Sequence, residues 1–214
     1  NTTSGVGCCG SIDCVATAVQ LLRAGRAKVM VAGGTEACLS RVGMSVLAAQ
    51  KVLTHRNDPP QAACRPYDRT RDGLVLSEGS GAVVLETAEH AMDRGAPIYA
   101  EVLGYAATTE AYHLLMAKPD GDELAKAFRL ALLEGKVSAD EIDYVCAHGI
   151  SNVQYDAAET NAVKMVLGER AYHVPMSSIK GTTGQPFAAG GAWQLVCACM
   201  AMQTSLLPPT INYR

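Results

Sequence analysis

Two adjacent cysteines, Cys8 and Cys9, lie in a glycine-punctuated turn within "SGVGCCGSIDCVATAVQLLRAG". The apolar residues that follow recur at helical spacing, which predicts a helix that begins just after the pair and ends at Gly25. A thiol at a helix N-terminus meets unpaired backbone N–H groups and the positive end of the helix dipole, and both stabilise a nucleophilic thiolate. Two small residues buried in a tight turn explain the same pattern, and the local sequence alone favours that interpretation.

Two other polar residues follow predicted strands. His148 ends the stretch "IDYVCAHG", and α/β sheets gather their ligands at the carboxyl ends of strands, although a buried core histidine fits the pattern equally well. Lys180 leads into a Gly/Thr-rich loop in "SSIKGTTGQPFAAGG", which lacks the spacing of a P-loop. A solvated charge at a strand end explains Lys180 equally well.

Strands and helices that alternate along the chain must position these residues. This order predicts a layered α/β fold in which helices cover mainly buried sheet faces. The continuous apolar run at 27–34 predicts a strand that is buried on both faces, and Ser138 with Glu141 forms a capping-box signal. Further strands are expected at the start of 81–95, at 98–108, at 142–149 and in a segment ending at 176–180, and further helices at the end of 81–95 and at 122–135, 156–167 and 188–203.

The composition narrows the class of protein. The chain has 214 residues, is 49% hydrophobic and carries a net charge of −3 without a basic stripe, so we expect no nucleic-acid partner. The longest apolar stretch, 188–202, is shorter than the roughly 20 residues that span a bilayer, so we expect no membrane segment. Without a secretion signal or a dense cysteine framework, a cytoplasmic protein is expected. The cysteine and histidine spacings also predict no metal site.

Several motifs occur in the order seen in the β-ketoacyl-acyl-carrier-protein synthases. They are "GCC", "VMVAGGTEA", "RNDPPQAACRPYDRTRDGLVLSEGSGAVVLE", "AYH", "AHG", "SSIKGTTG" and "PPTIN". The resemblance covers essentially the whole chain and is strongest with the condensing enzymes of type II fatty-acid and aromatic polyketide assembly. It implies the thiolase-like layered α-β-α-β-α fold, with residues 1–96 in the N-terminal half and 97–214 in the C-terminal half. Family members extend beyond both ends of this sequence, so we expect a fragment in which the fold is incomplete.

The resemblance also implies catalytic roles. Cys8 matches the acyl-accepting cysteine of the family, His148 the first active-site histidine, and Lys180 the lysine of the strand-end loop. Decarboxylating members carry a second histidine five residues after that lysine, where this chain has Gln185. A glutamine keeps a neutral N–H donor but cannot carry a positive charge.

Supporting and binding residues follow from the same resemblance. Asp156 and Glu159 are expected to support the His148 loop, and Arg56 resembles a surface arginine that meets the acidic carrier protein. Family members usually have threonines that line the pantetheine channel, and the matching positions in this chain are Leu115, Ile150 and Asn152. No bound cofactor is expected, because phosphopantetheine arrives on the acyl carrier protein. Family members are normally dimers, so a homodimer or a heterodimer with a ketosynthase-like subunit is expected.

The implied reaction is a decarboxylative Claisen condensation of a cysteine-bound acyl group with malonyl-carrier protein, in fatty-acid or polyketide biosynthesis. Two alternatives stay open. A non-condensing acyltransferase of the same superfamily would retain Cys8 and His148, and Gln185 favours this alternative. A catalytically silent partner subunit, akin to a chain-length factor, would typically lack the cysteine that Cys8 supplies.

Overall fold

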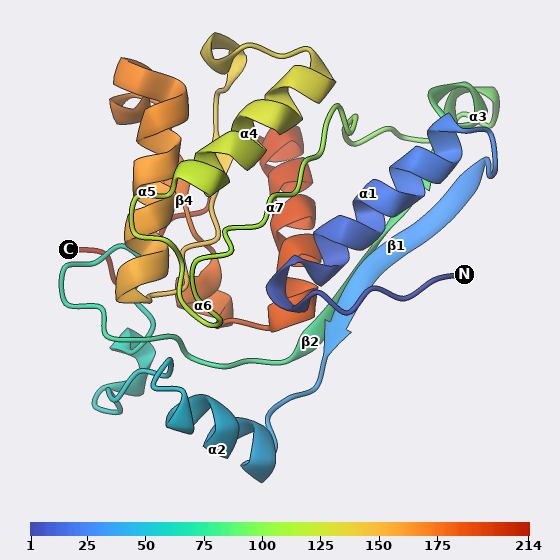
Figure 1. Cartoon of the computed structure of the whole chain (residues 1–214). Helices are drawn as coiled ribbons and strands as arrows, with labels where there is room; N and C mark the ends of the chain where they lie inside the picture. Colours follow the sequence, from blue (N-terminus) through green and yellow to red (C-terminus); the bar gives the residue numbers. More distant parts are fainter. The chain divides into compact units, whose positions relative to one another are not determined.

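The computed structural model describes residues 1–214 and shows mixed helices and strands (Figure 1). None of the helices is long and apolar enough to cross a lipid bilayer. The elements in chain order are α1 (Gly10–Arg23), β1 (Val29–Glu36), α2 (Arg41–Ala49), β2 (Gly79–Glu86), α3 (Ala88–Asp93), α4 (Asp122–Gly135), β3 (Val145–Cys146), α5 (Val153–Leu167), β4 (Met176–Ser177), α6 (Lys180–Thr183) and α7 (Gly190–Thr204).

The chain forms two compact units whose sequences interleave. The first unit contains Asn1–Ser45, Leu76–Val102 and Gln185–Leu207. The second unit contains Val46–Val75, Leu103–Gly184 and Pro208–Arg214. The division into 1–96 and 97–214 suggested by the sequence resemblance stays a prediction.

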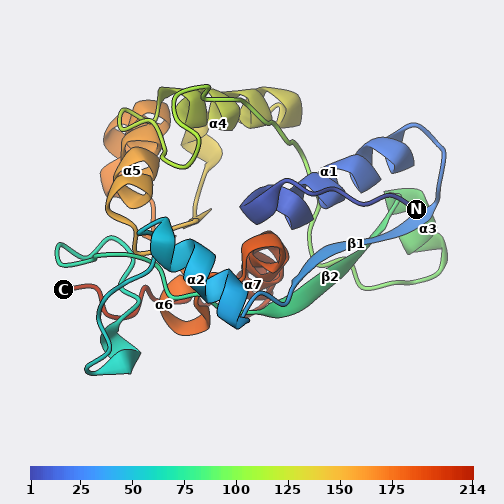
Figure 2. The same cartoon turned by 60° about the horizontal axis from the view of Figure 1, so that its bottom comes forward.

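The first unit is built on the antiparallel pair β1 and β2, in which Val29 lies opposite Glu86 and Glu36 opposite Gly79. Helix α1 lies along these strands in both views (Figures 1 and 2). Its buried side chains Val15 and Ala18 form a core with Ala32 of β1. The predicted helix after the cysteine pair is therefore confirmed, and its apolar face packs on the sheet.

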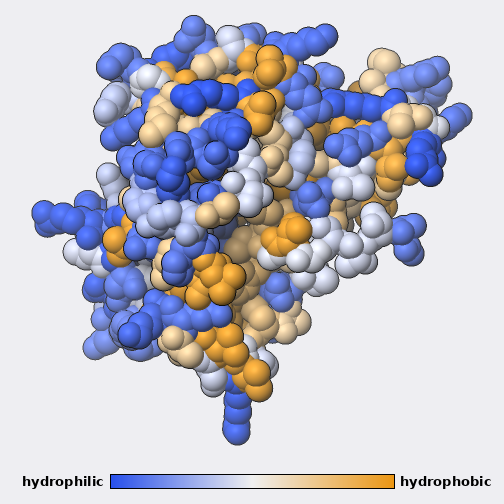
Figure 3. All heavy atoms as spheres, in the orientation of Figure 1, coloured by the Kyte–Doolittle hydropathy of each residue, from blue (hydrophilic) through white to orange (hydrophobic).

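The opposite face of β1 and β2 is open. Val31 and Val84 are paired across the two strands on this face and are 70% and 62% exposed. The prediction that the first strand is buried on both faces is therefore wrong for this structure, because α1 and α7 supply helical cover on one side only. Figure 3 shows one face of the molecule, on which apolar residues, coloured orange, lie among polar ones.

Helices α1 and α7 approach each other closely near the cysteine turn. Ser11 is fully buried, and its Oγ accepts a hydrogen bond of 2.8 Å from the backbone N–H of Ala192 near the start of α7. A Cβ added to Gly191 would lie 2.4 Å from Cγ1 of Ile12, so this contact requires a glycine. The close packing fixes the N-terminal end of α1, next to Cys8.

The second unit has short strands and longer helices. Strands β3 and β4 pair in parallel, with Val145 opposite Met176, so the strands predicted at 142–149 and in the segment ending at 176–180 have only two residues each. The capping box is confirmed, since the backbone N–H and Oγ of Ser138 both donate to Glu141.

The strand predicted at 98–108 is absent from the structure. In this segment the N–H of Tyr105 donates to the carboxylate of Glu134, and the hydroxyl of Thr108 donates to the backbone oxygen of Glu123. The segment therefore hydrogen-bonds to α4. Its alternating apolar residues resemble a strand only in pattern.

Candidate active site

The cysteine pair lies at the head of α1. Cys8 is part of a short 3-10 turn, Gly7–Cys9, that runs directly into the helix at Gly10. Gly7 has a φ of +62°, a left-handed conformation that glycine adopts without strain. Cys8 is half-buried, and all eight cysteines of the chain are free thiols. The turn thus holds one thiol at the positive end of a helix of fourteen residues.

Gln185 contacts the sulfur of Cys8. Its Nε2 donates a hydrogen bond of 3.1 Å to Cys8 Sγ, and its side chain is almost fully buried, with 1% of its surface exposed. The backbone oxygen of Gln185 accepts from the N–H of Ser77 at 3.1 Å, which anchors the residue. The structure therefore brings together two of the residues that the sequence singled out, although they lie 177 positions apart.

The other end of the Gln185 amide has no protein partner. Its Oε1 is buried and accepts no hydrogen bond. A buried acceptor left without any partner costs about 1–3 kcal/mol, so this oxygen is suited to accept from a bound water or from a substrate. The amide therefore presents one satisfied donor and one free acceptor beside the thiol.

The neighbouring thiol of Cys9 differs in its electrostatics. Although Cys9 as a residue is exposed, partial removal of its sulfur from water and the negative charge of Asp13 raise its pKa above the ordinary value. A raised pKa leaves less thiolate at a given pH. These surroundings make Cys9 a poorer nucleophile at neutral pH than an ordinary cysteine.

We therefore expect Cys8 to react before Cys9 with a limiting amount of iodoacetamide at pH 7. The difference between the alkylation rates of Cys8 and Cys9 should decrease as the pH rises toward the raised pKa of Cys9, because the thiolate fraction of Cys9 then increases. Fragmentation of the peptide that holds both cysteines locates the label. Cys9→Ser should retain the fast reaction and Cys8→Ser should lose it, whereas label on Cys9 alone would show that the assignment is wrong.

His148 lies in a loop held through its backbone. Glu159 of α5 accepts the N–H of His148 at 2.7 Å through Oε1 and the N–H of Gly149 at 2.9 Å through Oε2. Lys180, which is fully buried, donates from Nζ to the backbone oxygen of His148 at 3.1 Å. His148, Lys180 and Glu159 are thus brought together as a second predicted group.

Asp156 holds the next part of the same loop. It is 1% exposed, and its two oxygens accept the N–H groups of Ile150 and of Tyr67, each at 2.9 Å. Nε of Arg71 lies 3.5 Å from the same carboxylate. Burial raises the pKa of Asp156, while the two backbone donors and Arg71 act in the opposite direction. The supporting position expected for Asp156 therefore agrees with its contacts.

The imidazole of His148 is held in its neutral form. Removal from water, and secondly the positive charge of Lys180, lower its pKa from 6.5 to about 3. A neutral imidazole offers one N–H donor and one acceptor, rather than two donors. His148 can therefore serve as a hydrogen-bond donor at neutral pH without carrying charge.

An NMR titration of the His148 ring should show no protonation between pH 8 and pH 5. Because the folded pKa lies below the unfolded value of about 6.5, the unfolded chain takes up this proton first, and the stability of the fold decreases as the pH falls from about 6.5 toward 3. The urea-unfolded protein, which should titrate near 6.5, is the control. A midpoint near 6.5 in the folded protein would contradict this prediction.

The residues expected to bind the carrier protein and its pantetheine arm are buried or make hydrogen bonds within the chain. Arg56 is half-buried and donates from Nη2 to the backbone oxygen of Thr70 at 3.3 Å. Ile150 is 4% exposed, and the backbone oxygen of Leu115 accepts from the Tyr155 hydroxyl. Oδ1 of Asn152 caps α5 by accepting the N–H groups of residues 154 and 155. Their binding roles stay predictions.

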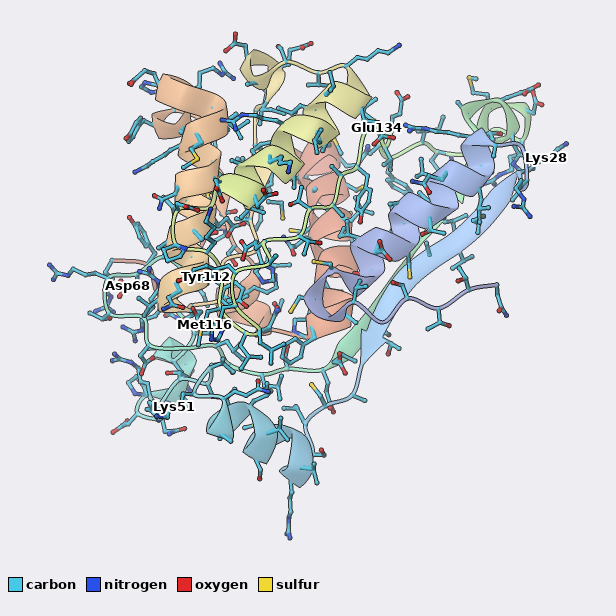
Figure 4. All side chains as sticks on the ribbon, viewed as in Figure 1. Lys28, Lys51, Asp68, Tyr112, Met116 and Glu134 are labelled. Carbon is cyan, nitrogen blue, oxygen red and sulfur yellow. The ribbon has the colours of Figure 1, made fainter.

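The loop at 64–73 contributes residues that the sequence interpretation missed. Its sequence, "CRPYDRTRDG", is typical of a polar, turn-rich loop, yet it carries Tyr67 and Arg71, which contact the residues around His148. Asp68, labelled in Figure 4, stabilises this loop by accepting the hydroxyl and N–H of Thr70 and the N–H of Arg214. The two bonds from Thr70 are the main reason that the pKa of Asp68 is lowered to about 2. The cluster of arginines and aspartates in this loop was the available signal.

Two family models match nearly the whole chain. The N-terminal domain of β-ketoacyl synthases matches residues 1–91, and the C-terminal domain matches residues 99–214. The chain belongs to the β-ketoacyl synthase family. The chain is 44% identical over 212 residues to a putative polyketide β-ketoacyl synthase 1 of Streptomyces virginiae, covering 99% of the chain and 50% of the relative. It is 39% identical to 3-oxoacyl-[acyl-carrier-protein] synthase 2 of Synechocystis sp., covering 99% of the chain and 51% of the relative.

Solved ketosynthases have the same fold as this chain. One belongs to a structure described as a type II polyketide acyl-carrier protein in complex with its ketosynthase bound to the hexaketide, and it matches with a TM-score of 0.96 at 40% identity, covering 98% of this chain and 52% of the other. The ishigamide ketosynthase/chain length factor matches with a TM-score of 0.89 at 32% identity, covering 100% of this chain and 50% of the other. The thiolase-like fold class is thereby confirmed. The chain spans about half the length of the curated relatives it matches.

Proposed function

We propose that this synthase joins an acyl group to a malonyl unit by decarboxylative Claisen condensation. The observation that carries the proposal is the Gln185 amide, which donates at 3.1 Å to the sulfur of a cysteine at the head of α1. Membership of the β-ketoacyl synthase family supports the reaction class. The similar proteins include a polyketide β-ketoacyl synthase and a 3-oxoacyl-[acyl-carrier-protein] synthase, so the proposal covers both polyketide and fatty-acid biosynthesis.

Cys8 is the proposed acyl acceptor. Its thiolate attacks the carbonyl carbon of the incoming acyl thioester, and the carrier thiolate leaves and takes up a proton. The positive end of α1, the Gln185 N–H and the backbone N–H of Cys8 itself stabilise the negative charge, first on sulfur and then on the tetrahedral oxygen. The result is an acyl group on Cys8 and a free carrier.

His148 and Gln185 are proposed to hold the thioester carbonyl of malonyl-carrier protein. As the bond to the carboxylate breaks, carbon dioxide leaves and negative charge develops on that carbonyl oxygen. Neutral N–H donors from an imidazole and an amide stabilise the resulting enolate. The enolate carbon then attacks the acyl group on Cys8, a carbon–carbon bond forms, and the Cys8 thiolate is released.

Lys180, Glu159 and Asp156 are proposed to position His148 rather than to react. Lys180 binds the backbone oxygen of His148, and Glu159 binds its N–H, so the backbone of this residue is held from both sides. Asp156 holds the following turn through Ile150. This backbone support leaves the imidazole available to a substrate.

The partners follow from the reaction. An acyl carrier protein supplies phosphopantetheine, with Arg56 as the proposed carrier contact and Leu115, Ile150 and Asn152 along the pantetheine arm. The synthase chain itself is proposed to bind no further cofactor and no metal, and to act in the cytoplasm. A dimer is proposed, either with a second copy or with a ketosynthase-like subunit such as the chain length factor named for one structural neighbour.

A non-condensing acyltransferase is the second candidate. The neutral amide of Gln185 favours it, because this side chain supplies no positive charge to a developing enolate. A silent partner subunit is disfavoured by the presence of Cys8 at the head of α1.

Two separate measurements on the whole protein distinguish the three functions. Intact mass after incubation with acyl-carrier protein reports acylation of Cys8, and carbon dioxide release from malonyl-carrier protein reports decarboxylation. We expect both. Acylation without carbon dioxide release would select the acyltransferase, and no acylation would select the silent subunit.

A further inference from the structure

Tyr67 contacts the carboxylate that holds the His148 loop. Its hydroxyl donates a hydrogen bond of 2.5 Å to Oε2 of Glu159. The same carboxylate accepts the backbone N–H groups of His148 and Gly149. Three donors therefore converge on Glu159, and the phenol is the only one of the three that comes from a side chain.

The backbone of Tyr67 is held in an unfavourable conformation. Its φ of +64° lies in the left-handed region, which is strained for a bulky residue. The N–H of Tyr67 donates to Asp156 at 2.9 Å, which stabilises this conformation. Such local strain persists only where surrounding contacts fix it, and it gathers at functional sites.

The ring of Tyr67 fits against the residue that follows His148. A Cβ added to Gly149 would lie 2.6 Å from Cε2 and 2.7 Å from the hydroxyl of Tyr67. The missing side chain at Gly149 thus makes room for the phenol to reach Glu159. The position of the Tyr67 hydroxyl beside the Glu159 carboxylate is therefore set by close packing against Gly149 as well as by the hydrogen bond.

The backbone oxygens of His148 and Gly149 also accept hydrogen bonds from side chains. Oγ of Ser178 donates to the backbone oxygen of Gly149 at 2.6 Å, and Nζ of Lys180 donates to that of His148. Both N–H groups and both oxygens of these two residues are therefore bound by side chains. In such a network the orientation of Glu159 decides whether the two N–H groups keep their acceptor.

We propose that the hydroxyl of Tyr67 is a positioning group for His148, acting through Glu159. It fixes the carboxylate in the rotamer that binds the N–H groups of His148 and Gly149, and so sets where the imidazole of His148 lies. Burial and the negative charge of Glu159 raise the pKa of Tyr67, so the phenol remains a donor throughout the working pH range. The catalytic consequence rests on the proposed function, whereas the structural consequence does not.

Tyr67→Phe in the whole protein tests the proposal by removing a single oxygen atom. Amide hydrogen exchange at His148 and Gly149 should accelerate about tenfold, as expected for the loss of one hydrogen bond to a charged group. The kcat for carbon dioxide release should fall by a similar factor, with the KM for malonyl-carrier protein and the rate of Cys8 acylation unchanged. Tyr172→Phe is the matched control, because Tyr172 is 66% exposed and is not part of the His148 loop.

A double-mutant cycle shows whether Tyr67 acts through Glu159. Tyr67→Phe combined with Glu159→Gln should be no slower than Glu159→Gln alone, since the two changes affect one interaction. Additive losses would overturn the proposal, as would unchanged exchange at His148 and Gly149 in Tyr67→Phe. Hydrogen exchange needs no substrate, so it decides the positioning role even if the unaltered protein releases no carbon dioxide.

Discussion

Replacing Cys8 with alanine is expected to abolish the acyl-enzyme and to lower the rate of condensation by at least about 10³-fold, as the loss of a nucleophile does in other covalent catalysts. Cys9 and Cys64 are not expected to replace it, because Cys9 has a raised pKa and Cys64 is buried with its pKa raised to about 11. Intact-mass analysis after incubation with acyl-carrier protein measures this effect directly.

Cys9→Ala is the matched control for this substitution. The neighbouring residue shares the 3-10 turn but makes no proposed contact with the acyl group, so this variant should acylate normally. An acyl group that persists in Cys8→Ala, at Cys9 or at any other side chain, would remove Cys8 from the mechanism.

Gln185→Ala is expected to reduce carbon dioxide release from malonyl-carrier protein by about 10²–10³-fold, or about 3–4 kcal/mol. The variant loses a neutral donor to the developing enolate. Since the same N–H donates to Cys8 Sγ, acylation should also slow, but by no more than about tenfold, because the helix terminus and the backbone N–H groups remain. Rapid-quench measurement of the two steps separates the effects.

Gln185→His is the informative companion variant. It restores the residue that decarboxylating family members carry at this position, and it retains an N–H donor. Carbon dioxide release should be kept or increased if the buried position accepts an imidazole. Unchanged release in Gln185→Ala would show that the amide takes no part in decarboxylation.

The parts of the fold that depend on local pattern were predictable. The helix after Cys8 follows from apolar residues at helical spacing, and the capping box at Ser138 follows from two residues three positions apart. The exposed face of β1 was not predictable, because a continuous apolar run does not indicate which neighbours cover it. Helix α2, Arg41–Ala49, was missed for a related reason, since its residues form no buried face in this structure.

Some residues of the candidate site were also predictable from the sequence, and others were not. Cys8, His148 and Lys180 stand out because each lies at the end of a predicted element, and the family resemblance then links them. Tyr67 carries no such signal, since its contact with Glu159 joins residues 92 positions apart. The loop around Tyr67 is polar and rich in turns, so only the folded chain shows that its phenol reaches the carboxylate behind His148.

A single-turnover experiment tests the central claim most directly. The whole protein is first acylated on Cys8, freed of excess acyl donor, and then mixed with malonyl-carrier protein. The account predicts one carbon dioxide and one 3-oxoacyl-carrier product for each acyl group lost from Cys8. Transfer of the acyl group to a carrier or to water without carbon dioxide release would contradict it.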